Sequence, residues 1–195
     1  MRDNFLNIIK ILIIFFSSHC ILIAEELNIT ASKVSFDKKK SIVILDGEIK
    51  ASDEKNNSLY ANKAEYNKKL NLLNSFGTTK IVTSQNYIFE SKNVEFDNNN
   101  KIIKSDFNTK ITDPDGNIIK VKMFNYNSIK NVLFSRGEII LEDKNKNEFL
   151  FSEIYIDEKS KKIIGSDAKI FFNDDSFKAN PDNDPRMFAN SISIS

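Results

Sequence analysis

Histidine and cysteine, two of the side chains that most often carry out catalysis, are absent from this chain outside its N-terminal stretch. His19 and Cys20 are its only histidine and its only cysteine, and both fall within an apolar run near the N-terminus. The remaining residues therefore offer neither a cysteine–histidine nucleophile nor the usual zinc and copper ligands. We expect a protein that is not an enzyme and that holds no metal and no cofactor.

Carboxylates are numerous, but they lie mostly in predicted turns. None of them has the paired spacing that is typical of general acid–base catalysis. The sequence DPDGN at residues 113–117 resembles part of a calcium-binding loop, yet it lacks the further ligands and the terminal glutamate of such a loop. A hairpin turn explains these residues without a metal. The chain also contains no glycine-rich phosphate-binding loop.

Lysines recur in one class of predicted turn and would form a row of cations along one edge of the fold. Such a row could meet the phosphates of a lipid, or it could be a solvated edge that discourages unwanted strand pairing. We favour the solvated edge. The lysines concerned are Lys38, Lys39, Lys40, Lys68, Lys69, Lys101, Lys130, Lys161 and Lys162.

The first two dozen residues have the pattern of an export signal. Arg2 and Lys10 give a basic start, the apolar run ILIIFFSSHCILIA follows, and Ala24 precedes the polar residues EELN. This pattern predicts that residues 1–24 are a signal peptide cleaved near Ala24. A retained N-terminal anchor is the alternative. The residues before Cys20 fit the processing of a lipoprotein badly.

The charge of the remaining chain is balanced. Removing residues 1–24 leaves 171 residues (195 minus 24), enough for one domain with a substantial core. They carry 26 Lys and Arg (28 minus Arg2 and Lys10) against 26 Asp and Glu (27 minus Asp3), so nothing indicates a nucleic-acid partner. An exported chain without cysteine has no disulfides, so its stability must come from packing and strand pairing, typically in an extensive sheet.

One pattern recurs through the chain with a spacing of 30 residues. Six columns, five of them sustained over five copies and one over four, are hard to obtain by chance, and such a period is typical of a repeat architecture. The columns are Phe36, Tyr66, Phe96, Tyr126 and Ile156; Asp37, Asn67, Asp97, Asn127 and Asp157; Ile42, Leu72, Ile102 and Val132; Ile29, Leu59, Phe89, Ile119 and Phe149; Ala31, Ala61, Ser91, Val121 and Phe151; and Val34, Ala64, Val94, Phe124 and Ile154.

Each copy alternates apolar and polar residues with period two, which predicts two strands joined by short polar turns. The first strand has two halves separated by a three-residue step, which would turn the second half to the opposite face unless a bulge or bend absorbs it. Gly47, Gly77 and Gly137 share a column in the second strand, where they would permit a bend. We therefore predict an all-β fold of about ten antiparallel strands, bent at the same place in every copy.

Neighbouring copies must stack, because one copy alone cannot bury its apolar face. The resulting folded sheet has two facing walls, and its apolar columns either fill a core or line a groove for a long hydrophobic ligand. The sequence does not separate these possibilities. The candidates for lining a groove are Ile29, Val34, Phe36, Leu59, Tyr66, Phe89, Val94, Phe96, Ile119, Phe124, Tyr126, Phe149, Ile154 and Ile156.

The pattern A-x-x-V-x-F-D, followed by a polar turn and a strand with G-x-I-x-I, resembles the OstA-like repeat. Copies such as ITASKVSFDKKKSIVILDGEIKA and FESKNVEFDNNNKIIKSDFNTKI carry it, and the similarity covers residues 25–178. The resemblance implies a periplasmic β-jellyroll, also described as a β-taco, of the lipopolysaccharide transport family. It further implies that acyl chains lie inside the fold and that such domains join end to end by edge-strand pairing.

Two members of this family are similar to the chain: the small LptA-type bridge protein and the N-terminal periplasmic domain of the LptD-type outer-membrane translocon. The tail NPDNDPRMFANSISIS resembles the exit from the jellyroll in the second, so residues 179–195 are expected to be an exit segment or a truncated further strand. The implied partners are lipopolysaccharide, other Lpt-type jellyrolls and the translocon. The alternative is an exported structural β-repeat protein, solenoid-like or adhesin-like, with a dry core.

Overall fold

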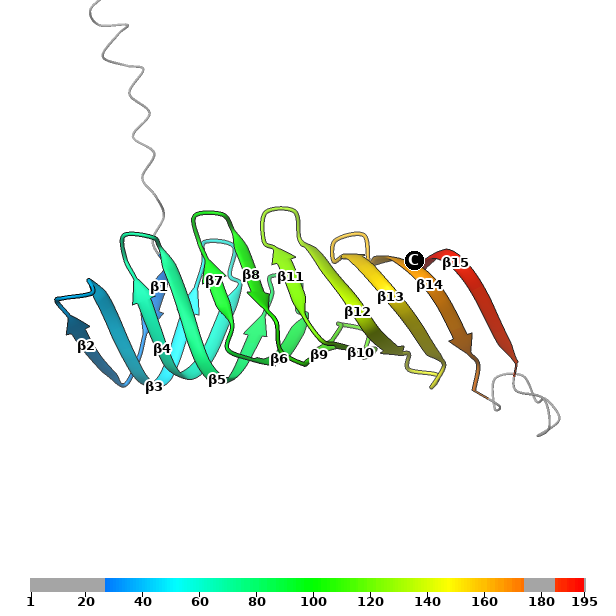
Figure 1. Ribbon diagram of the computed structural model, residues 1–195, viewed down its shortest axis with the longest axis horizontal. Helices are drawn as coiled ribbons and strands as arrows, with labels where there is room; N and C mark the ends of the chain where they lie inside the picture. The colour runs from blue at the N-terminus through cyan, green and yellow to red at the C-terminus, as the bar shows by residue number, and fades with distance from the viewer. Residues whose placement is uncertain (1–26, 174–184, 195) are drawn as a thin grey trace, which may run out of the picture.

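A single antiparallel sheet, folded along its length, accounts for the described part of the molecule (Figure 1). The computed structural model describes residues 27–173 and 185–194, so the predicted signal peptide at residues 1–24 lies outside the described residues. Within those ranges the protein has strands and no helix, which confirms the all-β, bent antiparallel prediction.

The described part of the sheet contains fifteen strands rather than about ten, because four of the predicted strands are interrupted at the bend and form two short strands each, and because β15 adds a strand within the expected exit segment. The strands are β1 (Asn28–Thr30), β2 (Lys33–Asp37), β3 (Ile42–Ser52), β4 (Ser58–Asn67), β5 (Leu72–Val82), β6 (Ile88–Lys92), β7 (Glu95–Asp97), β8 (Ile102–Ser105), β9 (Thr109–Thr112), β10 (Ile118–Val121), β11 (Phe124–Asn127), β12 (Val132–Glu142), β13 (Glu148–Asp157), β14 (Lys162–Phe171) and β15 (Arg186–Ile194).

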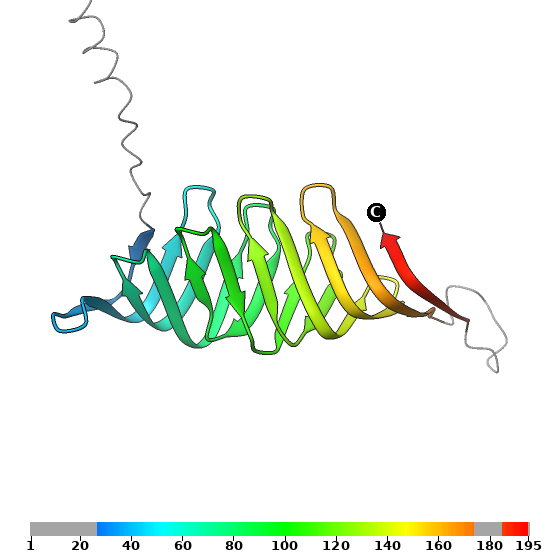
Figure 2. The ribbon, with the colours of Figure 1, turned by 45° about the horizontal axis from the view of Figure 1, so that its top comes forward.

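The bend divides the sheet into two walls. The first wall contains β1, β6, β9 and β10, and the second wall contains β2, β7, β8 and β11. The long strands β3, β4, β5, β12, β13, β14 and β15 cross the bend and contribute to both walls, as Figure 2 shows from a second direction. Successive second strands begin at Ile42, Leu72, Ile102, Val132 and Lys162, which follows the spacing seen in the sequence.

The bend is produced by irregularities in strand pairing at the predicted places. The register between β3 and β4 shifts between Asp46 and Ile49, and that between β12 and β13 shifts between Arg136 and Ile139. Gly77 and Gly137 have φ values of 77° and 102° in the middle of β5 and β12, a conformation that glycine adopts without steric cost. These bulges let apolar residues on both sides of the bend face the same interior.

The Asp/Asn column forms the turns between paired strands. Asp37, Asp97 and Asp157 each accept a hydrogen bond at Oδ1 from a backbone N–H two or three residues later, as in Lys39 N to Asp37 Oδ1 at 2.9 Å. The DPDGN segment is a hairpin turn of related design, because Asp113 Oδ1 accepts from the backbone N–H groups of Asp115 and Asn117. These side chains therefore accept hydrogen bonds from the backbone N–H groups of the turns.

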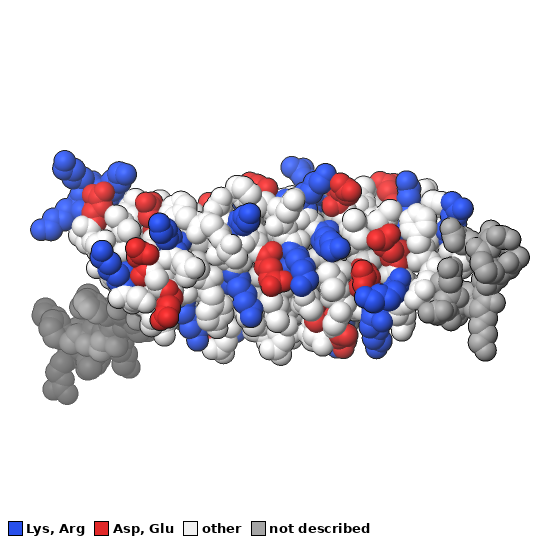
Figure 3. Space-filling model, turned by 90° about the horizontal axis from the view of Figure 1, so that it is seen from below, with Lys and Arg blue, Asp and Glu red and all other residues white. Residues whose placement is uncertain are grey.

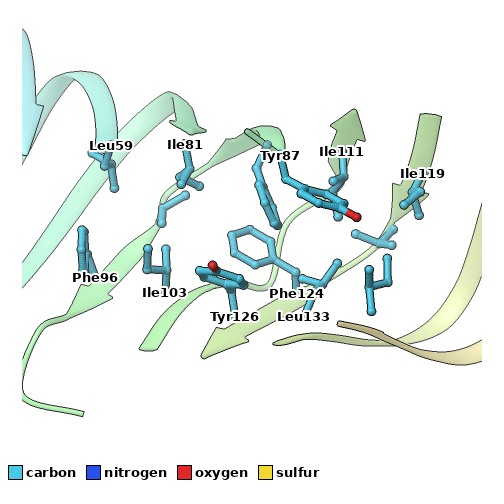
Figure 4. Packing of buried hydrophobic residues seen from close by; sticks show 14 of the residues in the cluster. Leu59, Ile81, Tyr87, Phe96, Ile103, Ile111, Ile119, Phe124, Tyr126 and Leu133 are labelled. Atoms are coloured by element: carbon cyan, nitrogen blue, oxygen red, sulfur yellow. The ribbon is translucent and has the colours of Figure 1, made fainter. Parts of the chain in front are cut away.

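The core lies between the inner faces of the two walls. Figure 4 shows Leu59, Ile81, Tyr87, Ile111 and Ile119 of the first wall opposite side chains of the second wall. The ring centroids of Phe89 and Phe124 are 5.0 Å apart across the interior. The labelled residues of the second wall are Phe96, Ile103, Phe124, Tyr126 and Leu133, and all are buried.

At the C-terminal end of the sequence the chain forms a strand over part of the expected exit segment. β15 pairs antiparallel with β14 from Ile163 opposite Ile194 to Phe171 opposite Arg186. Ala189, Ile192 and Ile194 pack against the core from this strand. The last described strand thus extends both walls.

Gly165 provides a test of packing between β13 and β14. A Cβ atom at this position would overlap the ring of Phe151, which belongs to the core. We expect Gly165→Ala to lower the free energy of unfolding by about 1–3 kcal/mol, since overpacking forces the ring or the backbone to move. Urea denaturation measures the change.

The control is a double-mutant cycle with Phe151→Leu. If the ring causes the loss, Gly165→Ala costs less in the Phe151→Leu background than in the wild-type background. Additive effects of the two substitutions would contradict the contact.

Candidate functional site

Ten of the fourteen candidate groove residues are buried between the walls. Ile29 and Phe149 are partly buried and pack against this core. The walls are in direct contact there, as the distance of 6.0 Å between the ring centroids of Phe89 and Tyr126 shows. Along the middle of the sheet the columns therefore pack together as a core. The buried candidates are Leu59, Tyr66, Phe89, Val94, Phe96, Ile119, Phe124, Tyr126, Ile154 and Ile156.

The remaining two candidates, Val34 and Phe36, are exposed at the N-terminal end of the sheet. Their exposed fractions are 61% and 58%, although both lie in register with inner-face residues: Val34 opposite Leu45 and Phe36 opposite Val43. Strand β2 is an edge of the second wall, because β3 is the only described strand that pairs with it. The inner face of the sheet is thus open to solvent at this end, which we call the N-terminal mouth, comprising Val34, Phe36 and the edge of β2.

Opposite the bend, two rows of turns meet along a line that we call the seam. The first-wall turns are residues 53–57, 83–87, 113–117 and 143–147, and the second-wall turns are residues 37–41, 67–71, 97–101, 127–131 and 157–161. Polar contacts cross the seam at several places. Lys55 Nζ donates to the carbonyl oxygens of Ser128 and Ile129, both at 3.4 Å.

Two lysines of the predicted cationic row lie in ion pairs across the seam. Lys101 Nζ is 3.4 Å from Glu54 Oε1, and Lys161 Nζ is 2.8 Å from Asp115 Oδ2. The Lys161–Asp115 pair is about half exposed on both sides, so solvent screens it and its contribution to stability is small. These lysines thus join the two rows of turns, a role that their position in turns did not predict.

A buried polar cluster crosses the seam near its middle. Glu158 lies in a second-wall turn and is almost fully buried. Its carboxylate accepts hydrogen bonds from Tyr126 Oη at 2.8 Å and from Thr83 Oγ1, in a first-wall turn, at 3.2 Å. Asn131 Nδ2 extends the cluster by donating to Ser84 Oγ at 3.2 Å.

Burial makes Glu158 a titratable group near neutral pH. Removal from water raises the pKa of Glu158 from 4.5 to about 7, although the hydrogen bonds from Tyr126 and Thr83 act in the opposite direction. Burial and the neighbouring Glu158 carboxylate raise the pKa of the Tyr126 phenol well above its usual value. Tyr126 therefore stays protonated and remains a donor to Glu158.

Sequence analysis missed Glu158 and Thr83. Glu158 occupies the turn column that holds Lys38 and Lys68 in other copies, and Thr83 occupies the column that holds Asp53 and Asp113. Thr83 departs from a column that is otherwise aspartate, whereas the column of Glu158 varies and also holds Asn98 and Ser128. A search for departures from the columns would therefore have singled out Thr83 but not Glu158.

Basic and acidic side chains are interspersed over the face seen in Figure 3. Within residues 27–173 and 185–194, no group of three His, Cys, Asp or Glu side chains is placed to hold a metal ion. The same residues include no helix that could cross a membrane.

A scan against protein-family models and a search of curated proteins both find no match to this chain. Among solved structures, the chain is similar to LptH from Pseudomonas aeruginosa, described as the LptA homologous periplasmic component of the conserved lipopolysaccharide transport device. The two chains are 11% identical, with a TM-score of 0.29, and the alignment covers 84% of this chain and 94% of that chain.

The buried Glu158 predicts an unusual dependence of stability on pH. Because its folded-state pKa is raised, this carboxyl contributes stability that is complete below about pH 4.5 and is lost as the pH rises through about 7. The loss is at most about 3 kcal/mol. Urea denaturation between about pH 5 and about pH 8 should show a falling free energy of unfolding, and Glu158→Gln should flatten the curve.

The matched control for this prediction is Glu148→Gln, which removes an exposed carboxylate from the start of β13. The control should keep the dependence on pH that the wild-type protein shows. Parallel curves for the wild-type protein and Glu158→Gln would show that Glu158 does not titrate in this range.

Proposed function

We propose that this chain is a periplasmic, non-enzymatic domain of lipopolysaccharide transport that holds acyl chains against the inner face of its folded sheet. The resemblance of its repeats to the OstA-like pattern and its export-signal-like start support this proposal. The bent antiparallel architecture with two facing apolar walls is the structure that such a carrier requires.

The observation that carries the proposal is the exposed apolar inner face at the N-terminal mouth. Val34 and Phe36 are large apolar side chains of the inner face, and they stay exposed because no described residue of the opposing wall covers them. Each methylene of an acyl chain buried against such a surface contributes about 0.8 kcal/mol. An acyl chain therefore has a ready contact at this mouth without any rearrangement of the core.

Passage through the middle of the sheet requires the walls to separate. There Phe89 contacts both Phe124 and Tyr126, so an acyl chain has to displace these contacts. The walls are joined by continuous strands at the bend and by polar contacts at the seam. Separation by opening the seam leaves the strands intact, and we propose that acyl chains reach the interior in this way.

The two ends of the sheet provide edges for neighbours. Among the described strands, β2 pairs only with β3 and is an edge at the N-terminal end, and β15 pairs only with β14 and is an edge at the C-terminal end. An edge strand presents unpaired backbone groups that can accept a further strand. We propose that another jellyroll of this type, or the outer-membrane translocon, pairs with one of these edges.

A second function is favoured by the packing of the middle of the sheet. The ten buried candidates fill the space between the walls, as expected for an exported structural β-repeat protein with a dry core. In this alternative the exposed mouth serves only to join copies of the chain, and no lipid enters.

Site-specific photo-crosslinking in cells tests the two functions. A photoreactive residue at Phe36 should capture lipopolysaccharide, because this side chain is exposed on the inner face. A residue at Phe96 should capture it more weakly, because this side chain is fully buried and the walls must part. The captured lipid is detected by a mobility shift and by antibody against lipopolysaccharide.

The matched control is Tyr155, which is similarly exposed but stands between the buried residues Ile154 and Ile156 and so faces outward. Capture at Phe36 without capture at Tyr155 supports lipid carriage. Capture at Tyr155 alone contradicts it, and capture of protein but no lipid at Phe36 supports the structural alternative.

A further inference from the structure

Six exposed lysines form a strip along the outer face of the first wall, which we call the basic strip. The strands of this wall lie side by side along the molecule (Figure 1). Each of the lysines directly follows a buried residue, so its side chain points outward. Three of them share one column of the 30-residue repeat, and two share another. The members of the basic strip are Lys50, Lys80, Lys92, Lys110, Lys120 and Lys122.

Strand pairing places four of these lysines in a single line across the first wall. Lys50 and Lys80 both lie opposite Tyr60 of β4, and Lys110 lies opposite Lys120 of β10. Because neighbouring strands are about 4.8 Å apart, the line from Lys50 to Lys120 is about 24 Å long. The cations therefore form a row rather than a round patch.

The carboxylates beside the basic strip do not balance its charge. Lys110 Nζ is 3.1 Å from Glu90 Oε2, and Lys122 Nζ is 2.8 Å from Glu138 Oε2. Glu48 is the third carboxylate beside the strip, so three carboxylates face six ammonium groups. Within the part of the chain that the structure describes, no ion pair neutralises the remaining four lysines, which are Lys50, Lys80, Lys92 and Lys120.

The outer face of the second wall is different, because its carboxylates outnumber its lysines. One of these lysines is already paired, with Lys104 Nζ at 2.8 Å from Glu95 Oε1. Positive charge is therefore gathered on one outer side of the fold. The charged residues on the strands of the second wall from β3 to β11 are Asp46, Glu65, Glu95 and Asp97 against Lys63 and Lys104.

A shallow hollow of about 420 Å³ lies at the β3 end of the basic strip. Lys50 and Lys80 line it on either side of Tyr60, and Asn62 lies beside them. Lys50 Nζ is 5.9 Å from the centre of the Tyr60 ring, so a cation and an aromatic side chain stand together. The hollow thus offers ammonium groups, an amide and an aromatic ring.

A second shallow hollow, of about 400 Å³, lies at the β10 end of the strip. Lys110, Lys120 and Lys122 line it, together with the amide of Asn108. Ile140 lies opposite Lys120 and supplies an apolar side chain. The two hollows therefore present the same three kinds of group, an ammonium, an amide and an apolar side chain.

An acidic sugar unit fits the chemistry of both hollows. Ammonium groups donate charge-assisted hydrogen bonds to carboxylates, and a side-chain amide both donates to hydroxyl groups and accepts from them. The C–H face of a sugar ring packs against an aromatic ring or an aliphatic side chain through dispersion. Both volumes lie within the range of about 300–1,000 Å³ that is typical of small-ligand sites.

The shape of the basic strip favours a chain over a membrane surface. On its seam side the neighbouring outer residues carry no charge, so the cations are confined to a narrow band. An anionic membrane attracts cations spread over a surface, whereas a linear polymer can follow a row. A chain that occupies both open hollows also gains by multivalency. The uncharged neighbours are Ser52, Ser58, Val82, Ile88, Thr112 and Ile118.

We propose that the basic strip binds a linear acidic polysaccharide along the outside of the first wall. One sugar ring packs on Tyr60 in the first hollow, and another packs on Ile140 in the second. Carboxylates of the chain accept hydrogen bonds from Lys80 and Lys120. The proposal goes beyond the proposed function, because this ligand needs no acyl chain and never enters the space between the walls.

Isothermal titration of the purified protein with decagalacturonate at low ionic strength tests the proposal. Its fully methyl-esterified form has the same chain without the charges and should bind at least tenfold more weakly, since each exposed ion contact contributes about two- to fivefold. Equal binding of the two forms would overturn the acidic ligand. One decagalacturonate per protein is expected, and two per protein would overturn a single chain across both hollows.

One variant in each hollow locates the site. Lys80→Gln and Lys120→Gln should each weaken the binding of decagalacturonate about two- to fivefold, because each removes one exposed ion contact. Lys159→Gln is the matched control, because Lys159 is an exposed lysine of a second-wall turn. It should leave binding unchanged. Equal losses in all three variants would overturn the assignment to the basic strip.

Cosedimentation with phosphatidylglycerol vesicles decides between a glycan and a lipid surface. Vesicle binding that is lost in Lys80→Gln, without any binding of decagalacturonate, would overturn the glycan in favour of a membrane. Binding of decagalacturonate without sedimentation supports the proposal. Neither variant alters Phe36, so lipid capture at Phe36 that persists in Lys80→Gln and Lys120→Gln separates this proposal from the proposed function.

Discussion

The bend in the strands is the constraint on which the rest of this structure depends. A flat sheet with these apolar columns would expose one whole face to water. The register shifts near Asp46 and Arg136, with left-handed backbone at Gly77 and Gly137, fold the sheet so that its inner face buries itself. Burial on this scale replaces both the disulfides and the second sheet that a sandwich would use. Every copy must bend at the same place, since one straight strand would interrupt both walls.

Folding a sheet in this way leaves a seam between the two rows of turns. Polar contacts, rather than apolar packing, close this seam. Hydrophobic packing holds the walls together from within, while single polar contacts link turns across the gap. Glu158 and Thr83 illustrate the constraint on these contacts. An aspartate at position 83, as at positions 53 and 113, would place a second carboxylate beside Glu158 in a buried site. Thr83 instead places an uncharged hydroxyl there, which donates a hydrogen bond to Glu158. The repulsion between two carboxylates is thereby avoided.

Most of the fold could be predicted from the sequence because the period repeats the same local information. The alternation, the turn residues and the step at Ala61 to Ala64 each specify the same bent strand, and the structure follows them. What could not be predicted depends on position along the stack. Phe36 and Phe96 belong to one column, yet the first is exposed and the second is buried, because only the second has neighbours on both sides and a wall opposite. The ion pairs of Lys101 and Lys161 likewise depend on which first-wall turn lies opposite each lysine, and the repeat pattern does not specify this.

The same dependence on position limits where a ligand can bind. In the middle of the stack, inner-face side chains have mutual partners such as Phe89 and Phe124, so any ligand there competes with existing packing. At the ends and along the seam, inner-face atoms such as those of Phe36 and the Tyr87 hydroxyl lack partners within the described chain. Free energy from burial is available only where burial is incomplete. Any ligand of the interior should therefore bind first at the openings of this fold, because the apolar columns between them already pack against each other.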